Sequence, residues 1–389
     1  MSEAASSYDF LVLGADGMQG SIVARDLLES GYHVYLADLY DVRVKSLQSK
    51  YPKQAMFAYV DLRDQEEIVH LIQHAGADVV INCAEGDWNI NVYRACIDVQ
   101  VNVIDLGSRT DMTREQIKMH MQFKRIRKTA ITGCGSVPGI GSVMLKHAAG
   151  KLDSIETIEA GFAWDSNQKL FVVPFSMESI LEEFTLPAPV IENRRWRKKH
   201  PQENATVRYL RSVGNQRIFL ADHPEVFTFY HYFKPWGVKN VRFWAGFPDH
   251  SVRVIETLID LGFSDSRPAH IDGIDITGPH YLGQFLKRLR HPRGYIEWEN
   301  LWVEVTGRKS RKKVKILMEC IVPPIKGWEQ AGCNVDTGFP ASLIAQMIKY
   351  GEIVKRGSYA PEAVVPVKPF FKRLKKKKLL VYENGELIN

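Results

Sequence analysis

Short apolar runs alternate with segments of helical periodicity over the first third of the chain. The runs fall at 10–13, 33–38, 56–60, 78–83, 101–105 and 129–133. Between them, apolar residues recur three or four positions apart, which predicts amphipathic helices over 64–72, 91–97 and 113–128. This alternation predicts an α/β domain with a doubly wound parallel sheet over residues 1–140.

The pattern changes after about residue 152, where apolar stretches become longer and richer in aromatic side chains. We expect strands at 154–163, 206–210, 218–220 and 241–245, a hairpin of 302–305 with 314–319, and helices at 179–184, 251–261 and 338–348. These elements predict an α+β domain over 141–345, built on a mostly antiparallel sheet. Residues 346–389 are expected to return to the first domain and to end in a basic tail.

A glycine-rich turn follows the first predicted strand. Gly14, Gly17 and Gly20 form a G-x-x-G-x-x-G directly before a helix. The first glycine permits the tight turn, the second lets the backbone approach a pyrophosphate, and the third lets the helix pack closely on the strand. The N-terminus of that helix offers free N–H groups to the phosphates. The first domain is therefore predicted to be a dinucleotide-binding Rossmann domain.

Asp38, at the end of the second strand, favours NAD over NADP. A carboxylate there accepts hydrogen bonds from ribose hydroxyls and repels a 2′-phosphate. Leu39 and Tyr40 supply no cation, and Arg43 is the nearest one. Asp16 departs from the pattern of a phosphate-binding turn, because it places a negative charge where the local field should favour binding of an anion.

Ligands of open α/β sheets bind along the carboxyl edge of the strands. Asp61, on that edge, is expected either to hydrogen-bond the adenine amino group or to cap the next helix. The segment 133–141 is a second glycine-rich turn for the nicotinamide end, with Pro138 in the first turn of the helix that follows. The predicted cofactor-binding residues are Gly14, Asp16, Gly17, Met18, Gln19, Asp38, Asp61, Leu62, Cys83, Ala84, Leu106, Gly107 and Pro138.

The net charge of +6 is concentrated in one place. Residues 368–378 carry seven cations and no acid, and without them the chain has 44 basic and 45 acidic residues. A solvated basic face of a C-terminal helix explains this run, and an anionic partner is the alternative. The five cysteines are scattered and never form C-x-x-C. We therefore expect reduced thiols in the cytoplasm, no metal site, no nucleic-acid partner and no membrane span.

Several motifs, taken in order, resemble the saccharopine dehydrogenase-like family and, within it, the L-lysine 6-dehydrogenases. They are the glycine turn with Asp38, then 103–107, 133–139, 173–179 with 184–188, 241–243 with Gly246 and His250, and 337–342. The resemblance implies an NAD(P)-dependent oxidoreductase, usually a homodimer, with a substrate site between its domains. The second domain would then bind the substrate and form the dimer.

The resemblance also suggests catalytic roles. Asp105 and Glu178 would hold the substrate ammonium, His250 would accept its proton, and Arg242 would bind an α-carboxylate. Each has a structural alternative: Asp105 as a loop cap, Glu178 as surface charge, His250 as a loop residue and Arg242 as an ordinary ion pair.

Three functions remain open from the sequence. The first is oxidation of the amine of a lysine-type amino acid to an imine or semialdehyde. The second is a saccharopine or carboxynorspermidine dehydrogenase-type reaction on a secondary amine, for which Arg109 or Arg211 would anchor a second carboxylate. The third is a non-catalytic dinucleotide-binding protein that docks through its lysine-rich tail. The bulky Trp88 and the added Arg109 depart from the lysine enzymes and weaken the first reading.

Overall fold

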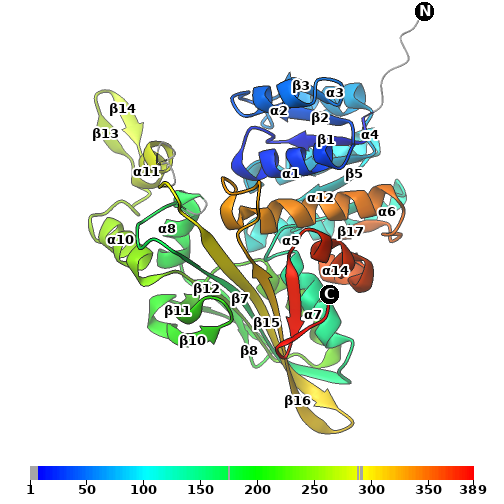
Figure 1. The fold of residues 1–389 in the computed structure, drawn as a ribbon. Coiled ribbons are helices and arrows are strands. Elements are labelled where there is room, and N and C mark those ends of the chain that lie inside the picture. The colour runs from blue at the N-terminus through cyan, green and yellow to red at the C-terminus, as the bar shows by residue number, and fades with distance from the viewer. Residues whose placement is uncertain (1–7, 174–175, 287–288, 290–291) are drawn as a thin grey trace, which may run out of the picture.

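The computed structural model describes residues 8–173, 176–286, 289 and 292–389. Pro174 and Phe175, in the 173–179 motif, lie outside the described residues. Two large sheets organise the chain, one in each part of the molecule (Figure 1).

The first sheet is parallel throughout, in the order β17-β6-β5-β4-β1-β2-β3. Its strands other than the edge strand β3 are almost fully buried apolar runs, as expected when helices cover both faces. This confirms the predicted doubly wound sheet. The bounds are β1 Phe10–Leu13, β2 Val34–Asp38, β3 Ala55–Tyr59, β4 Val79–Asn82, β5 Asn102–Asp105, β6 Thr129–Ile131 and β17 Gly357–Tyr359.

Helix α3 (Gln65–Ala75) shows how local sequence sets the ends of an element. The Asp64 side chain accepts hydrogen bonds from the backbone N–H groups of Glu66 at 2.8 Å and Glu67 at 3.2 Å. Gly76 ends the helix with φ 56°, a left-handed conformation that favours glycine. Asp64 is therefore the N-cap of α3. The other helices here are α1 Met18–Glu29, α2 Val44–Lys50, α4 Asn89–Val99 and α7 Ile140–Ala149.

The single helix expected over 113–128 is wrong. The chain forms α5 (Thr110–Lys118) and α6 (His120–Arg125), separated at Met119. The break turns α6 toward β17, where the His120 ring contacts the carbonyl oxygen of Ser358 at 3.2 Å. Because β17 lies far along the chain, local periodicity could not reveal this packing.

The second sheet is mostly antiparallel and is built around three long strands. β15 (Glu297–Lys309) pairs antiparallel with β7 (Ser154–Ser166) and with β16 (Lys312–Val322). One parallel pair, β7 with β12, interrupts the pattern. The remaining strands are β8 Ala188–Glu192, β9 Arg195–Lys199, β10 Thr206–Leu210, β11 Gly214–Leu220, β12 Asn240–Gly246, β18 Leu380–Glu383 and β19 Glu386–Leu387.

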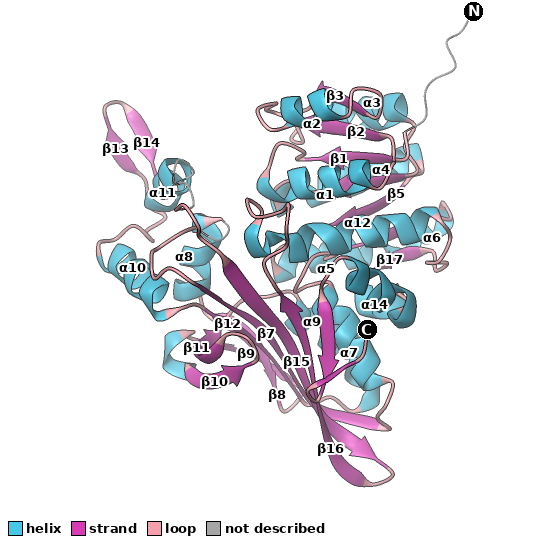
Figure 2. Cartoon of the chain, in the orientation of Figure 1, coloured by secondary structure: helices cyan, strands magenta, loops and turns pink. Residues whose placement is uncertain are grey.

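Three helices gather at the end of this sheet that lies opposite the β15–β16 turn (Figure 2). They are α8 (Met177–Thr185), α10 (Asp249–Asp260) and α11 (Gly278–Leu286). Helix α9 (Glu225–Phe233) packs nearer the first domain, and the small hairpin of β13 (Ala269–Ile271) and β14 (Ile274–Ile276) projects beside α11 (Figure 2).

The C-terminal third of the chain joins both sheets. Helix α12 (Val335–Lys349) packs so closely on α1 that a Cβ at Gly338 would lie 2.3 Å from the Ile22 side chain. After it, β17 pairs with β6 and β18 pairs with β16. Pro340 lies inside α12, because the helix begins before the predicted start.

Helix α14 (Val367–Lys376) carries the basic run. Phe370, Phe371 and Leu374 are buried against the core, while Arg373 pairs with Glu352 at 2.5 Å. Most of its lysines are exposed. The run is a solvated face of a packed amphipathic helix, preceded by the short α13 (Pro361–Val364).

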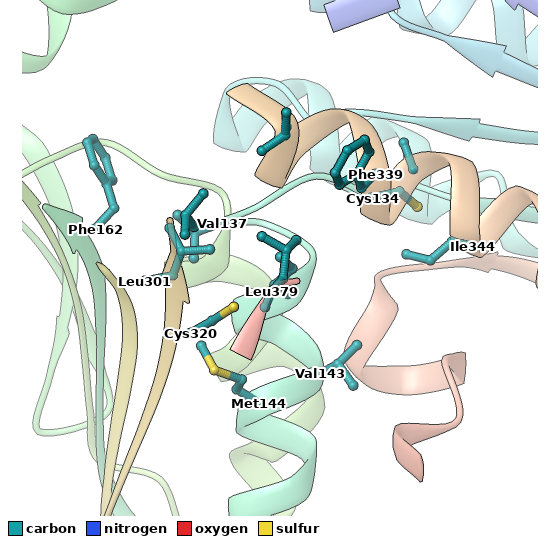
Figure 3. Packing of buried hydrophobic residues seen from close by; sticks show 14 of the residues in the cluster. Cys134, Val137, Val143, Met144, Phe162, Leu301, Cys320, Phe339, Ile344 and Leu379 are labelled. Carbon is teal, nitrogen blue, oxygen red and sulfur yellow. The ribbon is translucent and has the colours of Figure 1, made fainter. Parts of the chain in front are cut away.

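One apolar core is continuous through both parts of the molecule. Val143 on α7, Leu301 on β15 and Phe339 on α12 belong to the same buried cluster (Figure 3). Close packing of this kind resists deformation, so the edges of the two sheets are held in fixed relation. Among the described residues, no helix is long and apolar enough to cross a membrane.

Gly20→Ala tests the packing of α1 on the glycine turn. A Cβ at Gly20 would lie 1.9 Å from the Gly14 carbonyl oxygen, so the helix must shift. We expect the free energy of unfolding to fall by about 3 kcal/mol and stabilisation by NAD to be lost, measured by urea and thermal denaturation. Gly150→Ala is the control, because its nearest neighbour would be 3.5 Å away. Unchanged NAD stabilisation in Gly20→Ala would contradict this account.

Candidate active site

The first sheet reverses its strand order between β1 and β4, and dinucleotides bind at such a point. Gly14 lies there with φ 71°, and a Cβ on it would be 2.5 Å from the Ala84 nitrogen. Gly17 precedes α1 as its N-cap without a side-chain hydrogen bond, and no acidic residue lies in the first turn. The exposed backbone N–H groups therefore fit a pyrophosphate. Met18 and Gln19 form the start of the same helix.

Asp16 does not point its charge at the phosphate turn. Its carboxylate accepts hydrogen bonds from the backbone N–H groups of Arg43 and Val44, the latter at 3.0 Å, where α2 begins. The Arg43 guanidinium donates to the Asp16 carbonyl at 2.8 Å. Asp38 accepts the Asp16 backbone N–H at 2.9 Å and so lies beside the turn. The charge that opposed an anion in the sequence is thus taken up by a helix N-terminus.

The other predicted cofactor residues have varied surroundings. The Asp61 carboxylate is bound by the Arg63 side chain, with Nε at 2.9 Å, and Asp64 rather than Asp61 caps α3. Leu62 is buried, and burial also raises the pKa of the Cys83 thiol. Pro138 lies before α7 rather than in its first turn, and its ring contacts Gly107 and Gly133. Ala84 and Leu106 follow the ends of β4 and β5.

Asp105 is a structural anchor at the end of β5. Its side chain is buried, and burial raises its pKa. Its two oxygens accept hydrogen bonds from the Tyr93 hydroxyl (2.7 Å), the Gln116 amide (2.6 Å), the Thr132 hydroxyl (3.1 Å) and the backbone N–H groups of Gly107 (2.7 Å) and Gly133 (3.1 Å). Asp105 thereby fixes both turns next to the cofactor edge, and it does not line the cavity described next.

A cavity of about 240 Å³ lies between the two sheets. The first domain contributes Gln19, Ser136 and Val137, and α12 contributes Asp336 and Thr337. The second domain and the segment before α12 supply the remaining lining residues, which are Phe162, Trp164, Ser179, Glu183, His223, Glu297, Glu299, Cys333 and Asn334. The cavity therefore adjoins both the α1 N-terminus and the second glycine-rich turn.

The cavity wall is acidic. Glu183, Glu297, Glu299 and Asp336 all line it, and none of the described lining residues is Lys or Arg. Glu297 is satisfied by the Cys333 backbone N–H at 2.7 Å and the Tyr295 hydroxyl at 2.8 Å. Such a wall favours cationic ligands.

His223 is the one titratable base among the described lining residues. Its Nδ1 lies 3.2 Å from the Glu225 carboxylate and its Nε2 lies 3.8 Å from Glu183, while its ring stacks on Phe243 with centroids 3.8 Å apart. Burial alone would lower the pKa of His223, but the carboxylates of Glu225 and Glu183 raise it to about 10. The imidazolium is thus held charged near neutral pH.

The remaining predicted catalytic residues lie outside the cavity lining. Glu178 is on the exposed side of α8, 3.4 Å from His280. Arg242 pairs with Glu159 at 3.0 Å and with Glu192 at 3.2 Å, on the face of β12 opposite to Phe243, because strand side chains alternate.

His250, at the start of α10, packs edge-on against Trp164 with centroids 6.5 Å apart, one layer behind the wall. Burial lowers its pKa.

The acidic residues of the cavity were not among the predicted site residues, although the sequence contains signals for them. Glu297 and Glu299 are two positions apart, the spacing that places both on one face of a strand. Asp336 directly precedes the 337–342 motif, and Glu183 lies on the same helix as Glu178. The sequence could not show that β15 and α12 line the same cavity.

These features are those of an α/β protein with a Rossmann-like parallel sheet, a second, mostly antiparallel sheet and a cavity between the two. Residues 10–131 match the saccharopine dehydrogenase NADP binding domain, and residues 134–379 match the saccharopine dehydrogenase C-terminal domain. The apo saccharopine dehydrogenase (L-Glu forming) of Saccharomyces cerevisiae has the same fold, with a TM-score of 0.75 and 14% identity over 98% of this chain and 100% of that one.

Two relatives extend the comparison. The carboxynorspermidine synthase of Vibrio alginolyticus is 23% identical over 327 residues, which covers 79% of this chain and 78% of the relative. The carboxyaminopropylagmatine dehydrogenase of Synechocystis is 24% identical over 394 residues, which covers 94% of each.

The chain belongs to the saccharopine dehydrogenase family. It is an NAD(P)-dependent dehydrogenase that acts on an amine, and this supersedes the non-catalytic alternative.

Asp105→Asn tests the anchoring role. An amide nitrogen would face donors where an oxygen now accepts, leaving buried N–H or O–H groups unpaired. We expect the free energy of unfolding to fall by about 2–3 kcal/mol, measured by urea denaturation. Asp111→Asn, on the exposed start of α5, is the matched control. Equal stability of the two variants would show that Asp105 is free for another role.

Proposed function

We propose that the protein interconverts a secondary amine and its imine, in which one arm of the substrate is a cationic aminoalkyl chain. The acidic interdomain cavity carries this proposal. Four carboxyl groups line it, and among its described lining residues His223 alone carries positive charge. The names of the two relatives, a carboxynorspermidine synthase and a carboxyaminopropylagmatine dehydrogenase, point to substrates of this class.

The rim of the cleft supports the same proposal. Asp222 accepts a hydrogen bond from the Thr110 hydroxyl at 3.1 Å, and burial raises the pKa of Glu182 nearby. Arg109 pairs with Asp87 at 3.1 Å, and its charge opposes the rise in the pKa of Glu182. Arg109 is therefore the cation placed to meet a substrate carboxylate. Arg211 instead contacts Glu319 and the Gly385 carbonyl, away from the cavity lining.

Oxidation of L-lysine is less well supported. The α-carboxylate of a small amino acid would have to enter a wall of carboxyl groups in which the described lining offers no Lys or Arg. A longer substrate avoids this conflict, because its amino-acid end can reach Arg109 while its cationic arm occupies the cavity.

The glycine turn, the α1 N-terminus and Asp38 would hold the nicotinamide cofactor, which would supply or accept a hydride at the carbon next to the nitrogen. Asp105 and Pro138 keep the two neighbouring turns in place. Glu183, whose Oε2 has no described partner, attracts the distal ammonium group, and the Phe162 and Trp164 side chains exclude water.

We propose NAD as the preferred cofactor. Asp38 lies beside the turn, where its two oxygens accept the Asp16 and Tyr40 backbone N–H groups and keep lone pairs for ribose hydroxyls. The Arg43 guanidinium is already bound to the Asp16 carbonyl. A homodimer and a cytoplasmic location stay predictions.

A substrate panel tests the proposed reaction. Absorbance of the reduced nicotinamide would be followed with carboxynorspermidine, carboxyaminopropylagmatine, saccharopine and L-lysine, each with NAD and with NADP. We expect one of the two cationic secondary amines to give a kcat/KM at least about tenfold above that of lysine, a difference of about 1.4 kcal/mol. Lysine as the best substrate would refute the proposal.

Glu183→Gln tests whether Glu183 binds the cationic arm of the substrate. Loss of a buried charge that attracts the distal ammonium should raise KM for the cationic substrate about tenfold, corresponding to the 1.5–3 kcal/mol of a charged hydrogen bond, with a smaller effect on kcat. Glu66→Gln, an exposed residue on α3, is the control. A fall in kcat at constant KM would argue against a binding role.

A further inference from the structure

Two carboxyl groups touch each other in the cavity wall. Glu299, on β15, and Asp336, at the start of α12, are hydrogen-bonded side chain to side chain. Two ionised carboxylates this close repel each other, so the pair favours holding one proton between the two groups. The pair is therefore a store for a single proton.

Asp336 is oriented toward a ligand. It is 2% exposed, and its Oδ1 accepts a hydrogen bond from the Thr337 hydroxyl at 3.2 Å. Its Oδ2 is buried in the cavity wall and, the Glu299 carboxyl apart, accepts from no N–H or hydroxyl group among the described residues. A buried acceptor without a donor costs free energy, and a substrate N–H would satisfy it.

The pair also lies next to the nicotinamide-side turn. The hydroxyl of Thr337, the residue after Asp336, is also hydrogen-bonded to the Ser136 hydroxyl, with the two oxygens 3.2 Å apart. Ser136 belongs to the 133–141 turn and lines the cavity. A nitrogen undergoing redox at this edge would thus lie within the reach of the pair.

The Glu299–Asp336 pair has charged and titratable neighbours on several elements. Glu297 on β15 is held by two donors, Cys320 on β16 and Cys333 before α12 are buried thiols, and Gln19 on α1 is neutral. Across the cavity lie Glu183 on α8 and His223, whose charge is already balanced by Glu225 and Glu183. None of these is a Lys or Arg that would keep both carboxyls ionised.

We propose that Glu299 and Asp336 exchange their shared proton with the reacting nitrogen of the substrate, and this rests on the proposed function. In the reductive direction, the hydride of the reduced nicotinamide adds to the iminium carbon and leaves a neutral secondary amine. The pair then gives its proton to that nitrogen, forming the ammonium and leaving both carboxyls ionised. In the oxidative direction, the ionised pair takes the proton from the ammonium before the hydride leaves.

The two directions then have opposite pH dependences. Burial raises the pKa of Asp336 to about 7, and burial together with the Asp336 charge raises that of Glu299. Reduction needs the proton on the pair, so its kcat should fall as pH rises through about 7. Oxidation needs the proton gone, so its kcat should rise over the same interval.

The first experiment needs no cofactor or substrate. Infrared difference spectra of the free protein, taken below and above pH 7, should show the C=O stretch of a protonated buried carboxyl. Burial also raises the pKa of Glu362 to about 7, so the spectra are taken in a Glu362→Gln background. In that background Glu299→Gln and Asp336→Asn should each remove this band, while Glu256→Gln, at the surface pair with Arg217, should keep it. Either variant suffices if the other does not fold. A spectrum without the band would overturn the inference.

The second experiment is the pH profile of the substrate that turns over. Glu299→Gln should lower kcat about a hundredfold in both directions with little change in KM, and should flatten both pH limbs. Wild-type limbs in Glu299→Gln would overturn the inference while leaving the proposed function intact. Absence of turnover with every secondary amine, despite a normal carboxyl band, would contradict the proposed function and the role of the pair with it.

Discussion

Negative charge buried at the domain boundary is the constraint on which the site depends. Taking an unpaired ion out of water costs several kcal/mol, and four carboxyl groups line one cavity of about 240 Å³. Each is accommodated differently. Glu297 takes two donors, Glu183 faces the imidazolium of His223, and Glu299 and Asp336 lie against each other, where burial raises both of their pKa values. The negative potential that remains is what a cationic substrate would neutralise.

The apolar core makes this arrangement possible. Helix α12 packs on α1 in the first domain, while its first turn carries Asp336 to the carboxyls of β15. Helix α7 and the strands β15 and β16 share the same buried cluster (Figure 3). Since these elements cannot separate without opening the core, the acids and the cofactor edge are held in one geometry.

Local sequence was sufficient for the strands and the glycine turn of the first domain, but not for the break between α5 and α6. The glycine turn, Asp38 and the cap at Asp64 act within a few residues of themselves, so their positions follow from spacing alone. The catalytic candidates depended on long-range packing. Asp105 proved to bind residues up to 28 positions away, and Arg242 points from the opposite face of β12. The acids of the cavity come from separate segments whose meeting is set by the tertiary fold, so no single motif contains them.

A crystal structure of the protein with NAD and a cationic secondary amine would show whether the substrate binds among the carboxyl groups of the cavity. We expect the amine to lie in the interdomain cavity, with one nitrogen against Asp336 and Glu299 and the cationic arm toward Glu183. An amine bound outside this cavity, or a carboxylate group seated among its acids, would contradict the account.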